Sequence, residues 1–389
     1  MSPFEPRLAF EHLDKLAYEI GPRLAGSRGE QLAARYIRRY LESVGLEVSI
    51  QRFEFVSMIS RMRATSIILA GAFIASLFLP AFESLAAGVA GVAIVMVLPH
   101  MMPKKTSLNV IGKLRPKEGK KCVLITAHYD SAPCTRDRRI TIYLGLAFMP
   151  LVAAFLLLLA LRAAGWLPDW SMVWTGFSTI FLPTCGILFI ARTARVSPGA
   201  NDNASGVAIM LEVARAAAEN PFPDLELNFV ALGAEEQGAI GSRKLATKLK
   251  PGKTIALNLD MVGAGPRFYL VEGTGILRRK RTSKELNERL KQIGGDLGVK
   301  TELLWAPISG FDHVPLVRRG ISATTLTAGG LRRNRLDRLL GRLFKLAGAR
   351  TGRYPYMHTL EDIPERVELD NIEKAGEIVL KFIKTQSGA

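Results

Sequence analysis

Acidic and imidazole side chains gather in five short motifs that are spread over most of the chain. The motifs are AHYD with His128 and Asp130, GANDNASG with Asp202, LGAEEQG with Glu235 and Glu236, NLDMVG with Asp260, and MHTLED with His358 and Asp362. Imidazole and carboxylate groups are ligands that zinc accepts, and a catalytic zinc site keeps one position open for water. The chemistry that these motifs could support together is metal binding.

Each motif alone also has an interpretation without a metal. A His-x-Asp pair can be a hydrogen bond within a loop, a Glu-Glu pair can be surface charge, and an aspartate after a strand can cap a helix. The chain has only five histidines, and three of them, His128, His313 and His358, lie in motifs that contain aspartate. The set as a whole therefore favours a metal site.

Three of the motifs lie at the ends of stretches that are typical of buried strands, over residues 121–130, 225–232 and 254–262. Asp202 lies in a Gly- and Asn-rich turn just ahead of a predicted helix over 206–220. Ligand sites in open α/β sheets form at the carboxyl ends of strands. The sequence therefore predicts that these motifs meet at one edge of a sheet.

The wider pattern alternates strands with amphipathic helices. Further strands are predicted over 47–55, 108–114, 267–273 and 322–328, and further helices over 8–20, 29–44, 240–249, 283–298 and 370–384. This alternation predicts an α/β fold with a mixed, mainly parallel sheet that is covered by helices on both faces, which makes three α/β/α layers.

Four apolar runs interrupt this pattern, at about 64–82, 85–99, 140–161 and 171–191. About 20 apolar residues span the hydrocarbon core of a bilayer. Core helices rarely stay apolar on every face over such a length, so buried core helices are the weaker alternative. The sequence predicts four transmembrane helices arranged as two hairpins, 57–106 and 137–195.

Basic residues flank the ends of these hairpins that face the rest of the chain, whereas the two hairpin turns carry only Arg162. Lys and Arg collect on the cytoplasmic side of membranes. We therefore expect a multi-pass protein of the cell membrane with its remaining domain in the cytoplasm. The flanking residues are Arg61, Arg63, Lys104, Lys105, Arg136, Arg138, Arg139, Arg192 and Arg195.

The formal net charge of +17 lies largely beside the apolar runs. This placement fits an anionic membrane surface better than nucleic acid, so no nucleic-acid partner is expected. The pattern of residues 331–353 predicts a basic amphipathic helix that is inserted in the α/β domain. Such a helix can lie among lipid headgroups. A solvated or partner-binding helix is the alternative for this segment.

The motifs HYDS, GANDNASGVAIMLEVAR, LGAEEQGAIGSR, NLDMVG, GFDHVPLVRRGISA and HTLED occur in an order that resembles the M28 family of zinc-dependent peptidases. This family includes aminopeptidases, some carboxypeptidases and glutaminyl cyclases. The resemblance covers residues 8–55, 107–136 and 196–385. It implies one discontinuous zinc-exopeptidase-like domain, formed by 1–56, 107–136 and 196–389, into whose loops the hairpins are inserted.

The resemblance also implies the metal ligands and the catalytic cofactors, which are two Zn²⁺ ions. Asp202 would bridge both ions. His128 and Asp260 would complete the protein ligands of one ion, and Glu236 and His358 those of the other.

Further roles follow from the same resemblance. Glu235 would be the general base, taking a proton from the attacking water and giving it to the leaving amine. Asp130 would orient His128, and Asp362 would support His358 similarly. Asp312 and His313 match an Asp-His motif near the substrate pocket of the family.

One feature of the family pattern is absent. Several members have a tyrosine just before the Asp-His motif, placed to stabilise the oxyanion, where this chain has Pro307, Ile308 and Ser309. Tyr354 or Tyr356 could substitute for it.

The expected function is a membrane-anchored dizinc exopeptidase. It would act on peptides near the cytoplasmic membrane surface, and an aminopeptidase is favoured. The alternatives are a glutaminyl cyclase-like acyltransferase and a catalytically silent membrane receptor or scaffold.

Overall fold

The computed structural model describes residues 3–116, 121–135, 138–167, 172–276, 279–307, 310–330, 342, 354 and 356–387. The chain divides into two compact units. Unit 1 comprises Met1–Phe53, Thr106–Ala132 and Val196–Ala389, and unit 2 comprises Glu54–Lys105 and Pro133–Arg195. The basic helix predicted over 331–353 lies outside the described residues apart from position 342, so it stays a prediction.

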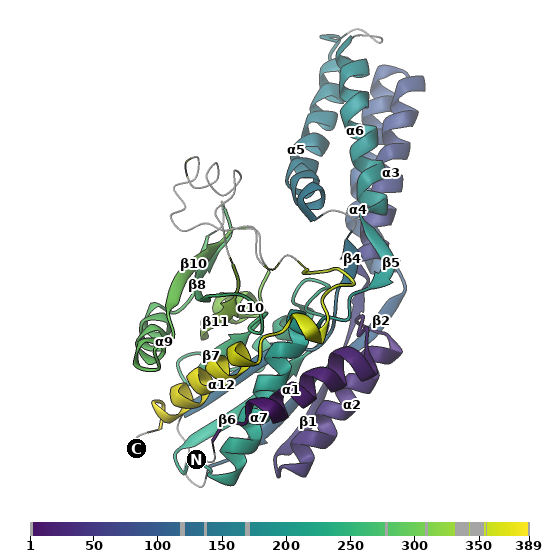
Figure 1. Cartoon of the computed structure of the whole chain (residues 1–389). Coiled ribbons are helices and arrows are strands. Elements are labelled where there is room, and N and C mark those ends of the chain that lie inside the picture. Colours follow the sequence, from purple (N-terminus) through teal and green to yellow (C-terminus); the bar gives the residue numbers. More distant parts are fainter. Residues whose placement is uncertain are drawn as a thin grey trace. The chain divides into compact units, whose positions relative to one another are not determined.

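Unit 1 is built on one mixed sheet (Figure 1). Over the described residues its order is β1-β2-β6-β3-β7-β11-β8-β10, and β9 pairs with β8. The central strands β6, β3, β7 and β11 run parallel, whereas β2 and β8 are antiparallel to their neighbours β6 and β11. The strands are β1 (Glu47–Val56), β2 (Lys104–Leu114), β3 (Lys121–His128), β6 (Leu225–Leu232), β7 (Thr254–Leu259), β8 (Phe268–Thr274), β9 (Lys280–Arg281), β10 (Thr301–Ala306) and β11 (Ser322–Ala328).

Helices cover both faces of this sheet. On one face α1, α2, α7, α9 and α12 share a large apolar core with the strands, and on the other α8 and α10 pack in a smaller core. Strand β3 shows the alternation that this requires, because Val123 and Ile125 face the first core and Leu124 faces the second. The helices are α1 (Pro6–Asp14), α2 (Arg28–Ser43), α7 (Ser205–Glu219), α8 (Ile240–Ala246), α9 (Lys284–Asp296), α10 (His313–Arg318) and α12 (Leu369–Lys384).

The predicted α/β class, with a mixed and mainly parallel sheet between two helical layers, is therefore confirmed. Strand β10 was not predicted, because its sequence TELLWA alternates poorly and is short. It pairs in parallel with β8 and extends the sheet by one strand.

Unit 2 contains four helices that run alongside one another (Figure 1) and a short two-stranded ribbon. Phe73, Phe155, Trp174 and Phe181 form the centre of its core. The helices are α3 (Met58–Phe78), α4 (Ala81–Met101), α5 (Arg138–Ala163) and α6 (Met172–Ile190), and the ribbon strands are β4 (Pro133–Thr135) and β5 (Arg192–Val196).

Three helices among the described residues are long and apolar enough to cross a membrane, namely α3, α4 and α6. Four were expected. The fourth, α5, has a described apolar stretch of only Ala147–Ala163, which is shorter than a full span. Only 22%, 17% and 28% of the apolar windows of α3, α4 and α6 are buried, so most residues of these windows are half-buried or exposed.

Arg162, the single basic residue expected at the hairpin turns, is buried inside unit 2. Its guanidinium donates to the carbonyl oxygens of Ser76 at 2.6 Å and Leu79 at 2.9 Å, and to the hydroxyl of Ser84 at 2.9 Å. These carbonyls belong to the end of α3, where a helix leaves such groups without a partner. Arg162 therefore caps the turn between α3 and α4 and joins the two hairpins.

Candidate metal centre

The predicted ligands lie at the carboxyl edge of three adjacent parallel strands. His128 ends β3, Asp260 directly follows β7, and Glu235 and Glu236 follow β6 within four residues. The ends of parallel neighbours must meet at one edge of a sheet, which explains why residues far apart in sequence come together here. Asp202 joins them from the turn before α7.

Asp202 lies between two histidines and directs one carboxylate oxygen to each. Its Oδ1 is 3.3 Å from His128 Nε2, and its Oδ2 is 3.3 Å from His358 Nε2. Asp260 Oδ1 is 4.0 Å from His128 Nε2, and Glu236 Oε1 is 3.0 Å from His358 Nε2. The five side chains thus form two groups of three that share Asp202.

Charge within this cluster favours a cation. Burial alone would lower the pKa of each histidine, because it disfavours the imidazolium. Against this effect, Glu236 and Asp202 raise the pKa of His358 to about 9. Asp130 and Asp202 likewise raise the pKa of His128. Burial opposes ionisation of Asp202, but its two histidine contacts hold the pKa of this carboxyl well below its usual range.

The donor atoms also fit a metal by their spacing. In each group of three, the possible ligand atoms lie within 4.8 Å of one another. Asp202 Oδ2 and His358 Nε2 are buried, yet they have no hydrogen-bond partner of normal geometry among the described residues. Buried polar atoms are rarely left in this way unless another group satisfies them. Because imidazole and carboxylate are donors that zinc accepts, the residues present fit zinc.

Asp130 lies beside the cluster and contacts both His128 and the Glu-Glu turn. The ring nitrogen Nδ1 of His128 is 3.1 Å from the backbone carbonyl of Asp130 and 3.7 Å from its carboxylate. The carboxylate also accepts the backbone N–H groups of Glu235 at 3.0 Å and Glu236 at 3.2 Å. Asp130 therefore orients the imidazole through its main chain and fixes the Glu-Glu turn through its side chain.

Asp362 contacts the turn that carries Asp202. Its carboxylate accepts the backbone N–H groups of Asn201 at 2.8 Å and Asp202 at 3.1 Å. Burial and the charge of Asp202 raise the pKa of Asp362 to about 7, although both amide contacts oppose this shift. Asp362 was expected to support His358, and the structure shows it holding the turn of Asp202, the ligand that both groups share.

Asn203 and Gly206, which sequence reasoning did not single out, lock the same turn against β7. The Asn203 side chain donates to the carbonyl of Leu259 at 2.8 Å and accepts the N–H of Met261 at 3.2 Å. A Cβ added at Gly206 would lie 2.8 Å from the Leu259 carbonyl oxygen, which is too close for a side chain. The asparagine and glycine content of GANDNASG was the only sequence signal for this close approach.

Arg23 is a third residue that sequence reasoning missed, and it is fully buried. Its guanidinium donates to five backbone carbonyls at 2.7–2.9 Å, those of Leu16, Gly21, Tyr129, Pro198 and Gly199. Tyr129 lies between His128 and Asp130, and Gly199 is three residues before Asp202. Arg23 therefore joins the two segments of unit 1 that flank residues 133–195 and carry site residues.

The backbone is strained at three places in the site. Ala234, Met261 and His358 adopt the left-handed region, with φ of 54°, 54° and 59°. Such conformations cost of order 1–3 kcal/mol for a residue with a side chain, and they persist only where surrounding contacts impose them. Each position is next to a site residue or is itself a predicted ligand.

Glu235 and Asp312 lie close enough to interact electrostatically. Glu235 is partly exposed; burial of its carboxyl raises its pKa, His128 opposes the shift, and Glu236 and Asp312 add to it. Asp312 is fully buried, and burial raises its pKa to about 7. His313, by contrast, directs its Nδ1 to the hydroxyl of Thr325, 2.6 Å away.

The two candidate tyrosines differ in their surroundings. Tyr354 is buried against Met261, and its hydroxyl has no hydrogen-bond partner among the described residues. The carboxylates of Asp362 and Asp202 are near enough to influence its pKa, which burial raises. The ring of Tyr356 instead packs under the guanidinium of Arg366 at 4.6 Å. Tyr354 is therefore the better placed hydroxyl, whereas residues 308–309 lie outside the described part of the chain.

An α/β sheet with this donor set at its carboxyl edge is the arrangement of a metal-dependent hydrolase centre. The chain belongs to Peptidase family M28, whose sequence model matches residues 184–383. The matched segment contains Asp202, Glu235, Glu236, Asp260 and His358, while His128 lies before it.

Two relatives share parts of the sequence. The chain is 30% identical to Aminopeptidase YwaD of Bacillus subtilis (strain 168) over 195 residues, which is 47% of this chain and 36% of that protein. It is 38% identical over 81 residues to the Probable lipoprotein aminopeptidase LpqL of Mycobacterium tuberculosis, which is 20% of this chain and 16% of that protein. The matches thus span little more than a third of the first relative's length, and less of the second's.

Solved structures resemble the fold over nearly the whole chain. BSAP, a zinc aminopeptidase from Bacillus subtilis, has a TM-score of 0.59 at 20% identity, covering 99% of this chain and 96% of that one. The glutaminyl cyclase of Porphyromonas gingivalis has a TM-score of 0.61 at 17% identity, covering 98% and 99%. At these identities the likeness establishes the fold alone, and the expected zinc-exopeptidase-like fold is confirmed.

Proposed function

We propose that the protein is a membrane-anchored dizinc aminopeptidase. The observation that carries this proposal is the arrangement around Asp202, whose two oxygens face two histidines in two separate groups of possible ligands. One ion would be held by His128, Asp202 and Asp260, and the other by Asp202, Glu236 and His358. A site for a single ion would need fewer ligands.

The chain's own residues supply the remaining chemistry. Zinc, when bound, is a Lewis acid that polarises a peptide carbonyl and makes water nucleophilic near neutral pH. Glu235 accepts a proton from the attacking water and passes it to the leaving amine. Asp130 holds the backbone of Glu235 in place, and partial exposure lets the carboxylate reach water.

Tyr354 and Asp312 complete the proposed centre. The buried hydroxyl of Tyr354 donates a hydrogen bond to the oxyanion of the tetrahedral intermediate, which takes the role of the tyrosine missing before Asp312. Asp312 and His313 lie at the substrate pocket. In this proposal the buried carboxyl of Asp312, which has the Ser242 hydroxyl beside it, accepts a donor from the substrate.

The activity is tested with purified, zinc-loaded protein and a panel of dipeptides, aminoacyl amides and peptides with N-terminal glutamine. We expect N-terminal residues to be released with addition of water, and Glu235→Gln to lose this activity while keeping its metal. Glu288→Gln, at an exposed glutamate on α9, is the matched control and should be unchanged. Hydrolysis by Glu235→Gln would remove the general base, and cyclisation of N-terminal glutamine without hydrolysis would favour the glutaminyl cyclase alternative.

The proposal includes anchoring in the cell membrane through four transmembrane helices, with unit 1 in the cytoplasm. Three of these helices have the required length, and most residues of their apolar windows are half-buried or exposed. Soluble proteins rarely expose apolar surface of this extent. Ala132 follows Asp130 by two residues and Val196 precedes Asp202 by six, so the chain enters and leaves unit 2 close in sequence to the ligands. This short spacing supports an active site near the membrane surface.

Topology is tested by labelling intact cells with a membrane-impermeant maleimide. In a variant without Cys122, Cys134 and Cys185, Trp166→Cys in the second hairpin turn should react from outside. Lys291→Cys, on α9 of unit 1, should react only after the cells are permeabilised. The reverse pattern would contradict the proposed orientation, and labelling of both in intact cells would contradict the transmembrane hairpins.

A further inference from the structure

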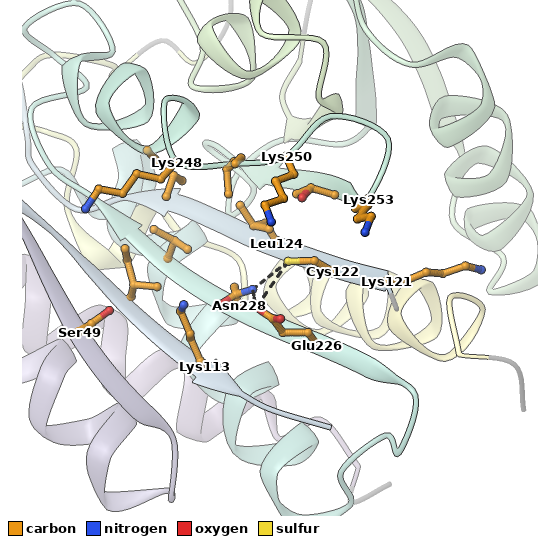
Figure 2. Close-up of a pocket in the computed structure, with 15 residues that line it drawn as sticks. Ser49, Lys113, Lys121, Cys122, Leu124, Glu226, Asn228, Lys248, Lys250 and Lys253 are labelled. Atoms are coloured by element: carbon orange, nitrogen blue, oxygen red, sulfur yellow. Dashed lines mark hydrogen bonds between the residues drawn. The ribbon is translucent and has the colours of Figure 1, made fainter. Parts of the chain in front are cut away.

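Unit 1 has a cavity of about 680 Å³ at the edge of the sheet opposite the metal centre (Figure 2). Lys121, Glu226 and Thr254 line it from the amino ends of β3, β6 and β7, the strands whose carboxyl ends lead to the predicted ligands. A strand rises about 3.3 Å per residue, so roughly 20 Å separates the two edges. We call this cavity the lysine pocket, and it is not part of the metal centre.

The lysine pocket carries uncompensated positive charge. Five lysines and one carboxylate line it, which leaves four positive charges in excess. That carboxylate, Glu226, already accepts the side-chain N–H of Asn228 at 2.8 Å. None of the five lysines forms an ion pair with a carboxylate of the described chain. Burial raises the pKa of the Cys122 thiol to about 11, so this side chain stays neutral. The lysines are Lys113, Lys121, Lys248, Lys250 and Lys253.

The interior of the pocket combines a polar floor with an apolar wall. Asn228 on β6 is only 6% exposed, and its Oδ1 has no hydrogen-bond partner among the described residues. A buried acceptor left in this way is unfavourable, and a donor on a ligand would satisfy it. Ile111 and Leu249 are half-buried and supply the apolar lining that a ligand can reach, above the buried Leu124, Val230 and Leu245.

We propose that the lysine pocket binds a nucleotide. Lysine ammonium groups bind phosphate as point charges, and several of them at one pocket suit a di- or triphosphate. The apolar wall suits a planar base, whose amino or ring N–H can donate to Asn228. The volume falls within the range of about 300–1,000 Å³ that small-molecule sites have. This binding goes beyond the proposed peptidase function and does not depend on it.

Lys113 and Lys250 are the residues with which to test the proposal. In Figure 2 they extend toward Asn228 from opposite sides, Lys113 from β2 and Lys250 from the loop after α8. Charge removal at both positions should weaken binding of a nucleotide triphosphate roughly tenfold or more, since each loses a charge-assisted contact. Lys291→Gln with Lys384→Gln removes the same charge at exposed positions outside the pocket and serves as the control.

The experiment is calorimetric titration of the purified protein, in zwitterionic nanodiscs, with ATP, GTP, CTP and UTP. We expect saturable binding of at least one nucleotide, weakened in Lys113→Gln with Lys250→Gln and unchanged in the control. Inorganic triphosphate and adenosine should each bind at least about tenfold more weakly, because triphosphate lacks the base and adenosine lacks the phosphates.

Three results would overturn the proposal. The first is absence of binding by all four nucleotides, and the second is equal affinity in the pocket variant and the control. The third is binding of inorganic triphosphate, or of phosphatidylglycerol vesicles, as tight as that of any nucleotide, which would reduce the pocket to a general anion surface. Glu235→Gln should bind nucleotide like the wild type, so failure of the peptidase proposal is visible separately.

Discussion

Replacement of Arg23 perturbs the metal centre from a position that contacts no predicted ligand side chain. Arg23→Met keeps the approximate length of the side chain and removes every donor. Five backbone carbonyls on both sides of residues 133–195 then lose this donor, although those of Leu16 and Gly199 each keep a backbone N–H partner. Burial lowers the pKa of Arg23 to about 10, so the guanidinium that is lost carries a full charge at neutral pH.

The expected magnitude follows from these contacts. A hydrogen bond from a charged donor contributes about 1.5–3 kcal/mol, but the cost of burying the charge offsets most of the sum of five. Breaking a buried charged set by removing one member typically costs about 3–5 kcal/mol. We therefore expect a loss of about 4 kcal/mol, or roughly 8–16 °C in Tm. Arg23→Lys keeps the charge with at most three donors and should lose about half as much.

The assay pairs thermal unfolding in detergent with zinc affinity measured by competition with a chelator. Leu290→Ala is the control, because Leu290 is fully buried on α9 and its truncation should cost about 2–5 kcal/mol. Both arginine variants should bind zinc at least tenfold more weakly below their Tm, whereas Leu290→Ala should bind it normally. An unchanged zinc affinity in Arg23→Met, or an equal loss in Leu290→Ala, would refute the positioning role.

Three further predictions concern catalysis and acid stability. Tyr354→Phe should lower kcat by roughly 10²–10³-fold with little change in KM, whereas Tyr356→Phe should not; equal effects would contradict the assignment. Asp130→Asn should lower kcat at least about tenfold with metal content retained, because the backbone of Glu235 loses an anionic acceptor; an unchanged kcat would contradict this. Burial lowers the pKa of His12 from 6.5 to about 4. The unfolded chain therefore binds the proton first as the pH falls below 6.5, and stability should fall by up to about 3 kcal/mol by pH 4. His12→Leu should remove this part of the acid sensitivity from Tm-versus-pH curves, and an unaltered curve would exclude His12 as its source.

Site residues could be predicted from the sequence where a strand pattern determines the position of the residue at its end. His128 and Asp260 follow apolar strands, and parallel neighbouring strands must bring their carboxyl ends to one edge. The structure accordingly places these residues in one of two ligand groups that share Asp202, the other being completed by Glu236 and His358. The fold class follows from the same alternation of strands and helices.

The hydrogen-bond partner of a side chain could not be predicted from the sequence where partners from several segments lie within reach. Asp130 and Asp362 were each assigned to a histidine two to four residues away, whereas their contacts with backbone amides of other segments had no signal in the sequence. Arg23 lies in a loop whose composition resembles a solvated one, and only the tertiary fold surrounds it with carbonyls. Long-range contacts of this kind leave no periodic signal in a single sequence.

Metal content per chain tests the central claim most directly. Zinc is measured by mass spectrometry in the wild type and in Glu236→Gln, Asp260→Asn and the double variant. We predict two ions in the wild type, one in each single variant and none held tightly in the double variant. A single zinc in the wild type, or one zinc retained by the double variant, would contradict a centre of two ions that share Asp202.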